Sequence, residues 1–179
     1  MRKKDASVRV LKLTYSALYL AIALVLPFLT GQIPQIGSML CPMHIPALLC
    51  GFVCGWQYGL VAGAIMPLLR SATLGMPPMF PTAVAMAFEL AAYGCAAGLL
   101  YRALPKKIDF VYVALVLSML IGRAVWGLAS AVLMMGTENV FTTQAFLAGA
   151  FINAWPGIIL HILVIPPVVL GLRRAKLMD

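Results

Sequence analysis

Charged residues are scarce in this sequence. Of its 179 residues, 10% are charged and 63% are hydrophobic, whereas soluble domains are about half apolar and about one quarter charged. Acidic residues number 5, against 13 lysines and arginines. A globule of this length buries only about 70% of its chain surface, so this much apolar surface needs lipid as part of its solvent. The composition excludes a water-soluble globule and predicts an integral membrane protein.

Cysteines, nucleotide-binding motifs and acidic pairs are also few or missing. The 4 cysteines (Cys41, Cys50, Cys54 and Cys95) lie in or beside apolar runs, so we expect reduced, buried thiols. Cys50 and Cys54 share a helix face, but no second pair of metal ligands follows, and we expect no metal site. Glu89 has no acidic partner nearby in sequence, so we expect no catalytic residues and no enzyme. Without a phosphate-binding glycine motif, the chain cannot use ATP by itself.

Six apolar segments follow one another, separated by loops rich in glycine, proline or polar residues. They predict an all-α integral membrane protein with six transmembrane helices in a single domain, 1–179. The predicted spans are 13–29, 43–55, 60–74, 82–104, 110–134 and 145–172. A helix that crosses a bilayer needs about 20 residues, and the second span is shorter than that. We therefore expect it to be tilted, broken or continuous with the next span. The first resembles a signal peptide without a cleavage site, so we expect a retained helix.

Lysines and arginines are grouped by position. They precede the first apolar run, fill one loop, and follow the last run (Arg2, Lys3, Lys4, Arg9 and Lys12; Arg102, Lys106 and Lys107; Arg173, Arg174 and Lys176). With six spans, all three groups fall on one side of the membrane. The positive-inside rule therefore predicts that both termini are cytoplasmic. Because the basic residues form no continuous soluble face, we expect no nucleic-acid partner.

Three ionisable residues lie inside predicted spans, where a charge costs several kcal/mol unless it has a partner. At 1.5 Å per residue, Arg70, Glu89 and Arg123 lie about 6, 10 and 15 Å from the outer ends of their helices. Asn153 lies about 12 Å deep, and His44 begins the second span at the outer level. Polar groups from five helices are thus predicted to meet at one depth, as an outward-facing substrate pocket requires.

Further residues complete the predicted substrate site. Tyr93 follows Glu89 by four residues and is placed to orient its carboxylate. Trp126 and Trp155 are candidates for the pocket wall or for interfacial anchors. His161 lies about 24 Å along its helix, so we expect it to make interhelical hydrogen bonds rather than to touch the ligand. The predicted substrate-binding set is therefore His44, Arg70, Glu89, Tyr93, Arg123, Trp126, Asn153 and Trp155.

Two intramembrane arginines face one carboxylate. In an alternative without a ligand, Glu89 forms a structural salt bridge with one arginine and Arg70 extends toward the outer surface. Even then, one guanidinium lacks a protein counter-ion. A bound anion would supply it, and a carboxylate fits the planar fork of arginine. The charges therefore favour a small organic acid as the ligand.

Small residues spaced four apart allow another helix to pack closely. Ala17 and Ala21 form such a pair in the first span, and the pairs Gly51/Gly55 and Gly59/Gly63 follow. Within a polytopic protein these pairs serve either internal packing or docking of a separate subunit.

The chain resembles the substrate-binding S components of energy-coupling factor (ECF) transporters. The likeness rests on the basic N-terminus before Ala17-x-x-x-Ala21, the uncharged loop before Pro42-Met43-His44-Ile45-Pro46, and the segments 55–59 and 75–81. It is most similar to the pantothenate branch. The resemblance implies that Ala17 and Ala21 dock a transmembrane coupling subunit and that two cytoplasmic ATPases supply energy. It also implies a multi-pass protein of a prokaryotic cell membrane that binds a vitamin-like anion without a cofactor of its own.

Two alternatives remain at this point. Folate and biotin also carry carboxylates, so an S component for another carboxylated vitamin fits the same charges. A stand-alone small-solute facilitator would share the polar cluster but would need a continuous polar route. The inner half of the predicted bundle offers few polar residues for such a route.

Overall fold

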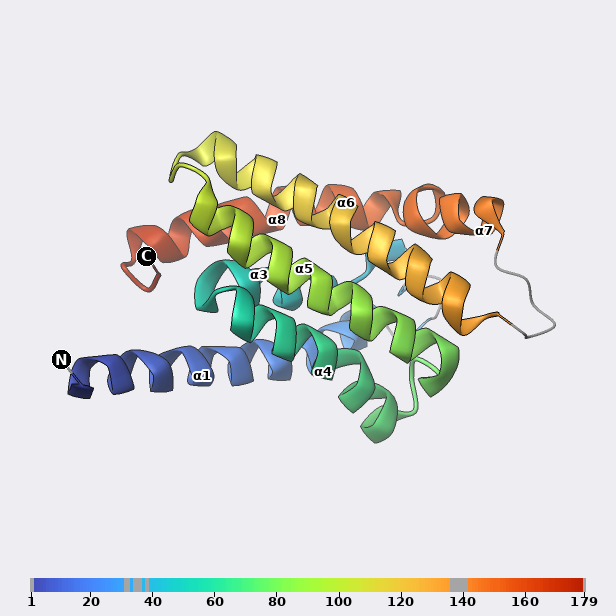
Figure 1. The fold of residues 1–179 in the computed structure, drawn as a ribbon, viewed down its shortest axis with the longest axis horizontal. Coiled ribbons are helices and arrows are strands. Elements are labelled where there is room, and N and C mark those ends of the chain that lie inside the picture. Colours follow the sequence, from blue (N-terminus) through green and yellow to red (C-terminus); the bar gives the residue numbers. More distant parts are fainter. Residues whose placement is uncertain (1, 31–32, 34–36, 38, 136–141, 179) are drawn as a thin grey trace.

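The computed structural model describes residues 2–30, 33, 37, 39–135 and 142–178, and every regular element in these ranges is helical. The elements are α1 (Arg2–Val25), η1 (Leu26–Thr30), α3 (His44–Cys54), α4 (Trp56–Leu74), η2 (Met79–Ala83), α5 (Val84–Ala103), α6 (Ile108–Leu133), α7 (Thr143–Leu147), η3 (Ala148–Ile152) and α8 (Trp155–Arg174). Figure 1 shows an elongated bundle in which α1 begins and α8 ends at the same end. The predicted uncharged loop 30–42 lies partly outside the described residues.

Apolar helices long enough to cross a membrane account for most of this bundle. Within the described residues, four segments qualify by length and hydropathy (Ala6–Leu29, Met79–Ala103, Ile108–Leu133 and Thr143–Arg174). Their outward faces expose large apolar side chains, such as Leu13 at 64%, Leu128 at 69% and Leu163 at 66%. Such exposure would be costly in water and is stable in lipid. The fold is therefore an all-helical membrane fold.

The predicted second span, 43–55, is a half-length helix. α3 has 11 residues, which extend about 16 Å against a hydrocarbon core of about 30 Å. Gly55, with φ of 97°, reverses the chain and begins α4. Figure 1 shows α3 confined to the half of the bundle that holds the start of α1 and the end of α8. The helices overlap all six predicted ranges, and the number of membrane crossings stays a prediction.

Glycines let α3 and α4 pack directly on the backbone of α5. A Cβ on Gly94 would lie 2.2 Å from the carbonyl oxygen of Gly59, and one on Gly51 would lie 2.2 Å from that of Gly94. Gly63 faces Leu90 in the same way, at 2.3 Å. Of the two functions considered for these glycines, the structure assigns internal packing. Gly55 forms the turn instead and has no neighbour within 4 Å of its Cβ position.

The close approach of α3, α4 and α5 creates a dry core that α6 completes. Leu48, Leu90 and Leu115 are fully buried there, and Met66 of α4 joins them. α1 packs on this core through one face, which buries Tyr19 and Ala23. This tight packing holds α5 and α6 in fixed register, so polar side chains on these two helices are positioned by the surrounding apolar contacts.

Candidate functional site

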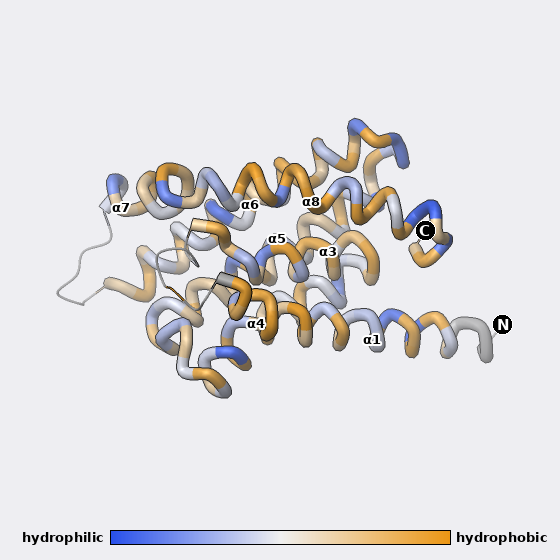
Figure 2. The backbone as a smooth tube through the Cα atoms, turned by 180° about the vertical axis from the view of Figure 1, so that it is seen from behind, coloured by the Kyte–Doolittle hydropathy of each residue, from blue (hydrophilic) through white to orange (hydrophobic). Residues whose placement is uncertain are grey.

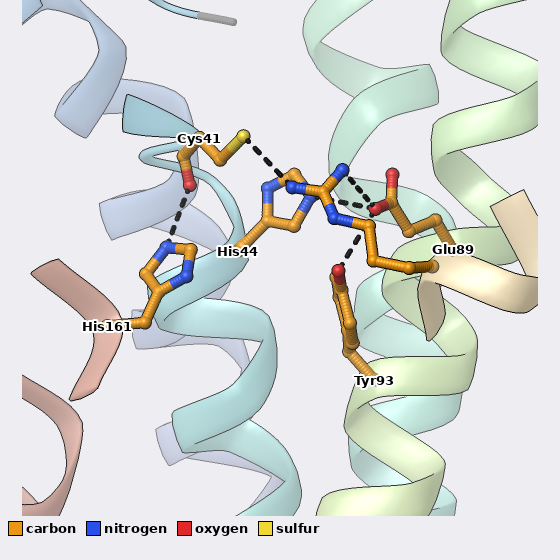
Figure 3. A network of polar contacts seen from close by, with 6 residues as sticks. Cys41, His44, Glu89, Tyr93 and His161 are labelled. Carbon is orange, nitrogen blue, oxygen red and sulfur yellow. Dashed lines mark hydrogen bonds and ion pairs between the residues drawn. The ribbon is translucent and has the colours of Figure 1, made fainter. Parts of the chain in front are cut away.

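Six polar side chains meet inside the bundle and form what we term the central polar cluster. They come from the residues just before α3, from α3 itself, and from α5, α6 and α8: Cys41, His44, Glu89, Tyr93, Arg123 and His161. Figure 3 shows the labelled side chains of the cluster converging from these elements. All six are buried. Ionisable side chains enclosed by apolar helices mark a functional site in membrane proteins.

The carboxylate of Glu89 is the centre of the cluster. Its Oε1 lies 2.9 Å from Nη1 of Arg123 and accepts a hydrogen bond of 3.1 Å from the hydroxyl of Tyr93. Nε2 of His44 lies 3.3 Å from the same oxygen. Because Tyr93 follows Glu89 by four residues on α5, both side chains share one helix face. At 1% exposure Glu89 depends on these partners to remain ionised.

Arg123 connects the centre of the cluster to the segment before α3. While Nη1 binds Glu89, Nη2 donates to Sγ of Cys41 over 3.5 Å. A thiol is a weak acceptor, so this second contact is much weaker than the ion pair. Of the two intramembrane arginines, Arg123 is therefore the one that pairs with Glu89.

His44 is buried without satisfying its ring nitrogens. The residue is 3% exposed, and among the described residues neither Nδ1 nor Nε2 has a hydrogen-bond partner. Nε2 faces Oε1 of Glu89 at an ion-pair distance of 3.3 Å, whereas Nδ1 has no hydrogen-bond partner in the described chain. Buried polar atoms are nearly always paired in folded proteins. The ring of His44 thus has unused hydrogen-bonding capacity beside the ion pair.

His161 lies next to His44, although the two were predicted at different depths, and it contacts another segment, as expected. The two rings stack with centroids 5.9 Å apart, and Nε2 of His161 lies 3.3 Å from the carbonyl oxygen of Cys41. The depth prediction for His44 was wrong because it placed the start of the second span at the outer surface. α3 starts inside the bundle, so His44 lies level with His161, which is near the middle of the apolar segment Thr143–Arg174.

The described contacts of Arg70 are with residues outside the central polar cluster. Its Nη1 donates to the carbonyl oxygen of Leu24 over 2.5 Å, and its guanidinium lies 5.3 Å from the ring centroid of Phe28. Since α1 ends at Val25, the Leu24 carbonyl belongs to the last turn, whose carbonyls have no partner within the helix. Arg70 therefore fastens α4 to the end of α1, and none of its described contacts involves Glu89 or Arg123.

The remaining predicted site residues are also not brought to the cluster. Trp126 is half-buried and stacks on Phe146, with ring centroids 6.2 Å apart. Asn153 is exposed, and Trp155 is 58% exposed. Of the eight predicted substrate-binding residues, the structure joins His44, Glu89, Tyr93 and Arg123.

Two members of the cluster, Cys41 and His161, were absent from the predicted site. Cys41 is buried, as predicted from its position beside an apolar run. Its thiol accepts a hydrogen bond from Arg123, and its carbonyl oxygen contacts His161. The available signal was the sequence Cys41-Pro42-Met43-His44, which places a thiol next to a candidate ligand residue in an uncharged loop. For His161 the signal was its rarity, since the chain has 2 histidines.

The predicted docking pair lies on the surface. Ala17 and Ala21 are exposed on α1, on the side opposite the buried Tyr19 and Ala23. Only 17% of the apolar window of this helix is buried within the bundle. The small-residue face of α1 is therefore free of intramolecular packing in the described part of the chain.

Apolar helices enclosing a buried set of ionisable side chains define a helical membrane protein with an internal polar site. A family model for the substrate-specific component of ECF transporters matches residues 11–169. The chain therefore belongs to this family, whose members are transporter subunits and not enzymes, and which work in the lipid bilayer with membrane and ATPase modules. Comparisons with curated proteins and with solved structures gave no match.

Proposed function

We propose that this chain captures pantothenate for an ECF-type vitamin uptake transporter and binds it at the central polar cluster, in a pocket that opens outward. The unsatisfied ring of His44 carries the proposal. An unpaired buried polar group costs about 1–3 kcal/mol, and a ligand bearing hydroxyl, amide and carboxylate groups supplies the missing partners. Pantothenate has all three.

Arg123 is the proposed anchor for the ligand carboxylate. A carboxylate is a stronger acceptor than the thiol that now faces Nη2 of Arg123, so the ligand displaces Cys41. The guanidinium then bridges Glu89 and the ligand. The ring nitrogens of His44 are available to hydrogen-bond the hydroxyl and amide groups of the ligand. Tyr93 holds Glu89 in place throughout this exchange.

The exposed face of α1 is the proposed docking surface for the coupling subunit. Ala17 and Ala21 let a partner helix approach closely, and their exposure leaves them accessible. We further propose that both termini are cytoplasmic, on the side where two ATPases supply the energy. The chain itself then uses no cofactor.

Mass spectrometry of small molecules released from the gently purified protein, followed by calorimetric titration, tests the proposal. We expect pantothenate to be recovered and to bind, while thiamine, a cationic vitamin, does not. Binding of biotin or folate instead would retain the transporter role and overturn the pantothenate assignment. A protein that binds no vitamin, or that mediates uptake into vesicles without any ATPase, would contradict the capture function.

A further inference from the structure

A basic groove lies at the opposite end of the bundle from the α4–α5 connection. It consists of two adjoining cavities, of about 360 and 390 Å³, that share Lys12, Gln57 and Tyr58. The charged and polar residues that line this groove are Arg9, Lys12, Gln57, Tyr58, Arg102 and Lys106. None of the described lining residues is acidic. The groove therefore gathers four basic side chains in one place.

Local contacts hold Lys106 in place beside the groove. Nζ of Lys106 lies 3.7 Å from the ring centroid of Tyr101, a buried residue of the groove wall. The backbone carbonyl of Lys106 accepts a hydrogen bond from Arg173 of α8. Lys106 is thus fixed both through its side chain and through its backbone. Trp56, at the start of α4, lines the same cavity and adds an aromatic side chain of the kind that gathers at lipid headgroups.

The groove lies close to the ends of two apolar segments that are long enough to cross a membrane. Arg9 and Lys12 fall within the apolar segment Ala6–Leu29, and Arg102 falls at the end of Met79–Ala103. Lys12 is six residues from the start of its segment, or about 9 Å along the helix axis. Figure 2 shows hydrophilic segments at this end of the bundle, next to the long hydrophobic stretches of α1 and α8.

We propose that the basic groove binds the phosphate group of an anionic phospholipid headgroup. Lysine and arginine recognise phosphate through charge-assisted hydrogen bonds, and basic pockets between membrane helices select anionic lipids. The position of the groove beside apolar helix surface favours a phospholipid over a dissolved phosphate ion as its ligand. The cations border apolar helix surface, including Val8, which is 46% exposed and lines the groove. A phospholipid covers that apolar surface with its acyl chains, and a free ion does not.

Native mass spectrometry of the full-length protein in detergent tests this proposal, with phosphatidylglycerol and phosphatidylcholine added in equal amounts. The groove variant combines Lys12→Gln, Arg102→Gln and Lys106→Gln. The control variant combines Lys107→Gln, Arg174→Gln and Lys176→Gln, which removes the same charge from residues that do not line the groove. Each basic residue near an anionic lipid contributes about fivefold in affinity. We expect retained phosphatidylglycerol to fall about tenfold or more in the groove variant alone.

Equal loss in both variants, or equal retention of the two lipids by the wild type, would overturn the proposal. Displacement of phosphatidylglycerol by millimolar inorganic phosphate would identify a soluble phosphate as the ligand and overturn the lipid assignment. A groove variant that keeps the lipid but no longer co-purifies with the other transporter subunits would point to a protein partner instead. If the triple variant melts below the wild type, the single variant Arg102→Gln, at an exposed position, takes its place with an expected loss of about fivefold. No vitamin is present, so the result is independent of the proposed substrate.

Discussion

The ring of His44 at the start of α3 stacks on the ring of His161 in α8, with centroids 5.9 Å apart and planes inclined by 20°. The two residues are 117 positions apart in the sequence, the difference between their numbers. Their contact fixes the start of α3 deep in the bundle, beside the Glu89–Arg123 pair. The two histidines nevertheless have different surroundings, since His161 contacts a backbone carbonyl whereas the His44 ring has no hydrogen-bond partner in the described chain. We therefore expect a change at His44 to affect mainly ligand binding and a change at His161 to affect mainly stability.

Replacing His44 with phenylalanine is expected to weaken pantothenate binding more than it lowers stability, because Arg123 and Tyr93 still contact Glu89. The new ring keeps the stacking contact with His161 and removes both ring nitrogens, of which Nε2 faces Glu89 and Nδ1 has no hydrogen-bond partner in the described chain. Affinity should fall about 10- to 100-fold, which corresponds to about 1.5–3 kcal/mol for hydrogen bonds to a charged group. Calorimetric titration and thermal melting in detergent measure the two quantities.

His161→Phe is the matched control for that prediction. It removes the contact with the Cys41 carbonyl, so we expect a stability loss of about 0.5–1.5 kcal/mol and a smaller effect on affinity. Equal affinity of His44→Phe and the wild type would remove His44 from the ligand site.

Breaking the Glu89–Arg123 pair on one side is expected to destabilise the protein strongly. Glu89→Gln or Arg123→Gln leaves an uncompensated buried charge, at a cost of about 3–5 kcal/mol. The double variant should lose less than the sum of the two single variants, because neither charge remains. Thermal unfolding of all four proteins in detergent gives the coupling energy.

Arg70→Gln provides the control for the loss of a buried arginine. It removes the bond to Leu24 and should lower stability without changing substrate affinity, since no described contact links Arg70 to the cluster. Additive effects of Glu89→Gln and Arg123→Gln would contradict the ion pair, and a large affinity loss in Arg70→Gln would return this arginine to the ligand site.

Gly94→Ala is expected to disrupt the packing of α4 on α5. Its Cβ would lie 2.2 Å from the backbone oxygen of Gly59, and neither backbone is able to move without displacing a helix. We expect a loss of about 1–3 kcal/mol or more, seen as a lower melting temperature. Gly171→Ala is the control, because no atom lies within 4 Å of its Cβ position in α8. That change should be neutral or stabilising by about 0.5–1 kcal/mol; similar melting of both variants would refute the close contact.

Leucine at both Ala17 and Ala21 is expected to block assembly while sparing the fold and vitamin binding. Both positions are exposed, so the larger side chains meet no atom of the bundle but keep a partner helix at a distance. Co-purification with the coupling subunit measures assembly. Ala124→Leu, at an exposed position of α6, should assemble normally. Normal assembly of the α1 variant would argue against docking on this face.

Local spacing and depth predicted part of the central polar cluster. Glu89 and Tyr93 are four residues apart on one helix, so their contact follows from helix geometry alone. Arg123 and Glu89 lie on long helices that begin near the surface, so counting residues placed them at similar depths. The same count failed for His44, because α3 does not begin at the surface. It also grouped Arg70 with the cluster, since depth does not specify which neighbour a helix face meets.

The sequence by itself determined that this protein is a helical membrane protein, because its composition leaves lipid as the stable surrounding for its apolar surface. It also determined the positions of the charges inside the helices, where each needs a partner. Only the tertiary structure decided which partners they have. Backbone contact at Gly59 and Gly94 draws α4 onto α5, and the reversal at Gly55 keeps α3 within one half of the bundle. The residues that make these packing contacts are far in sequence from Arg123 and His161. No local sequence pattern therefore predicts that Arg123 contacts Glu89 or that His161 contacts the Cys41 carbonyl.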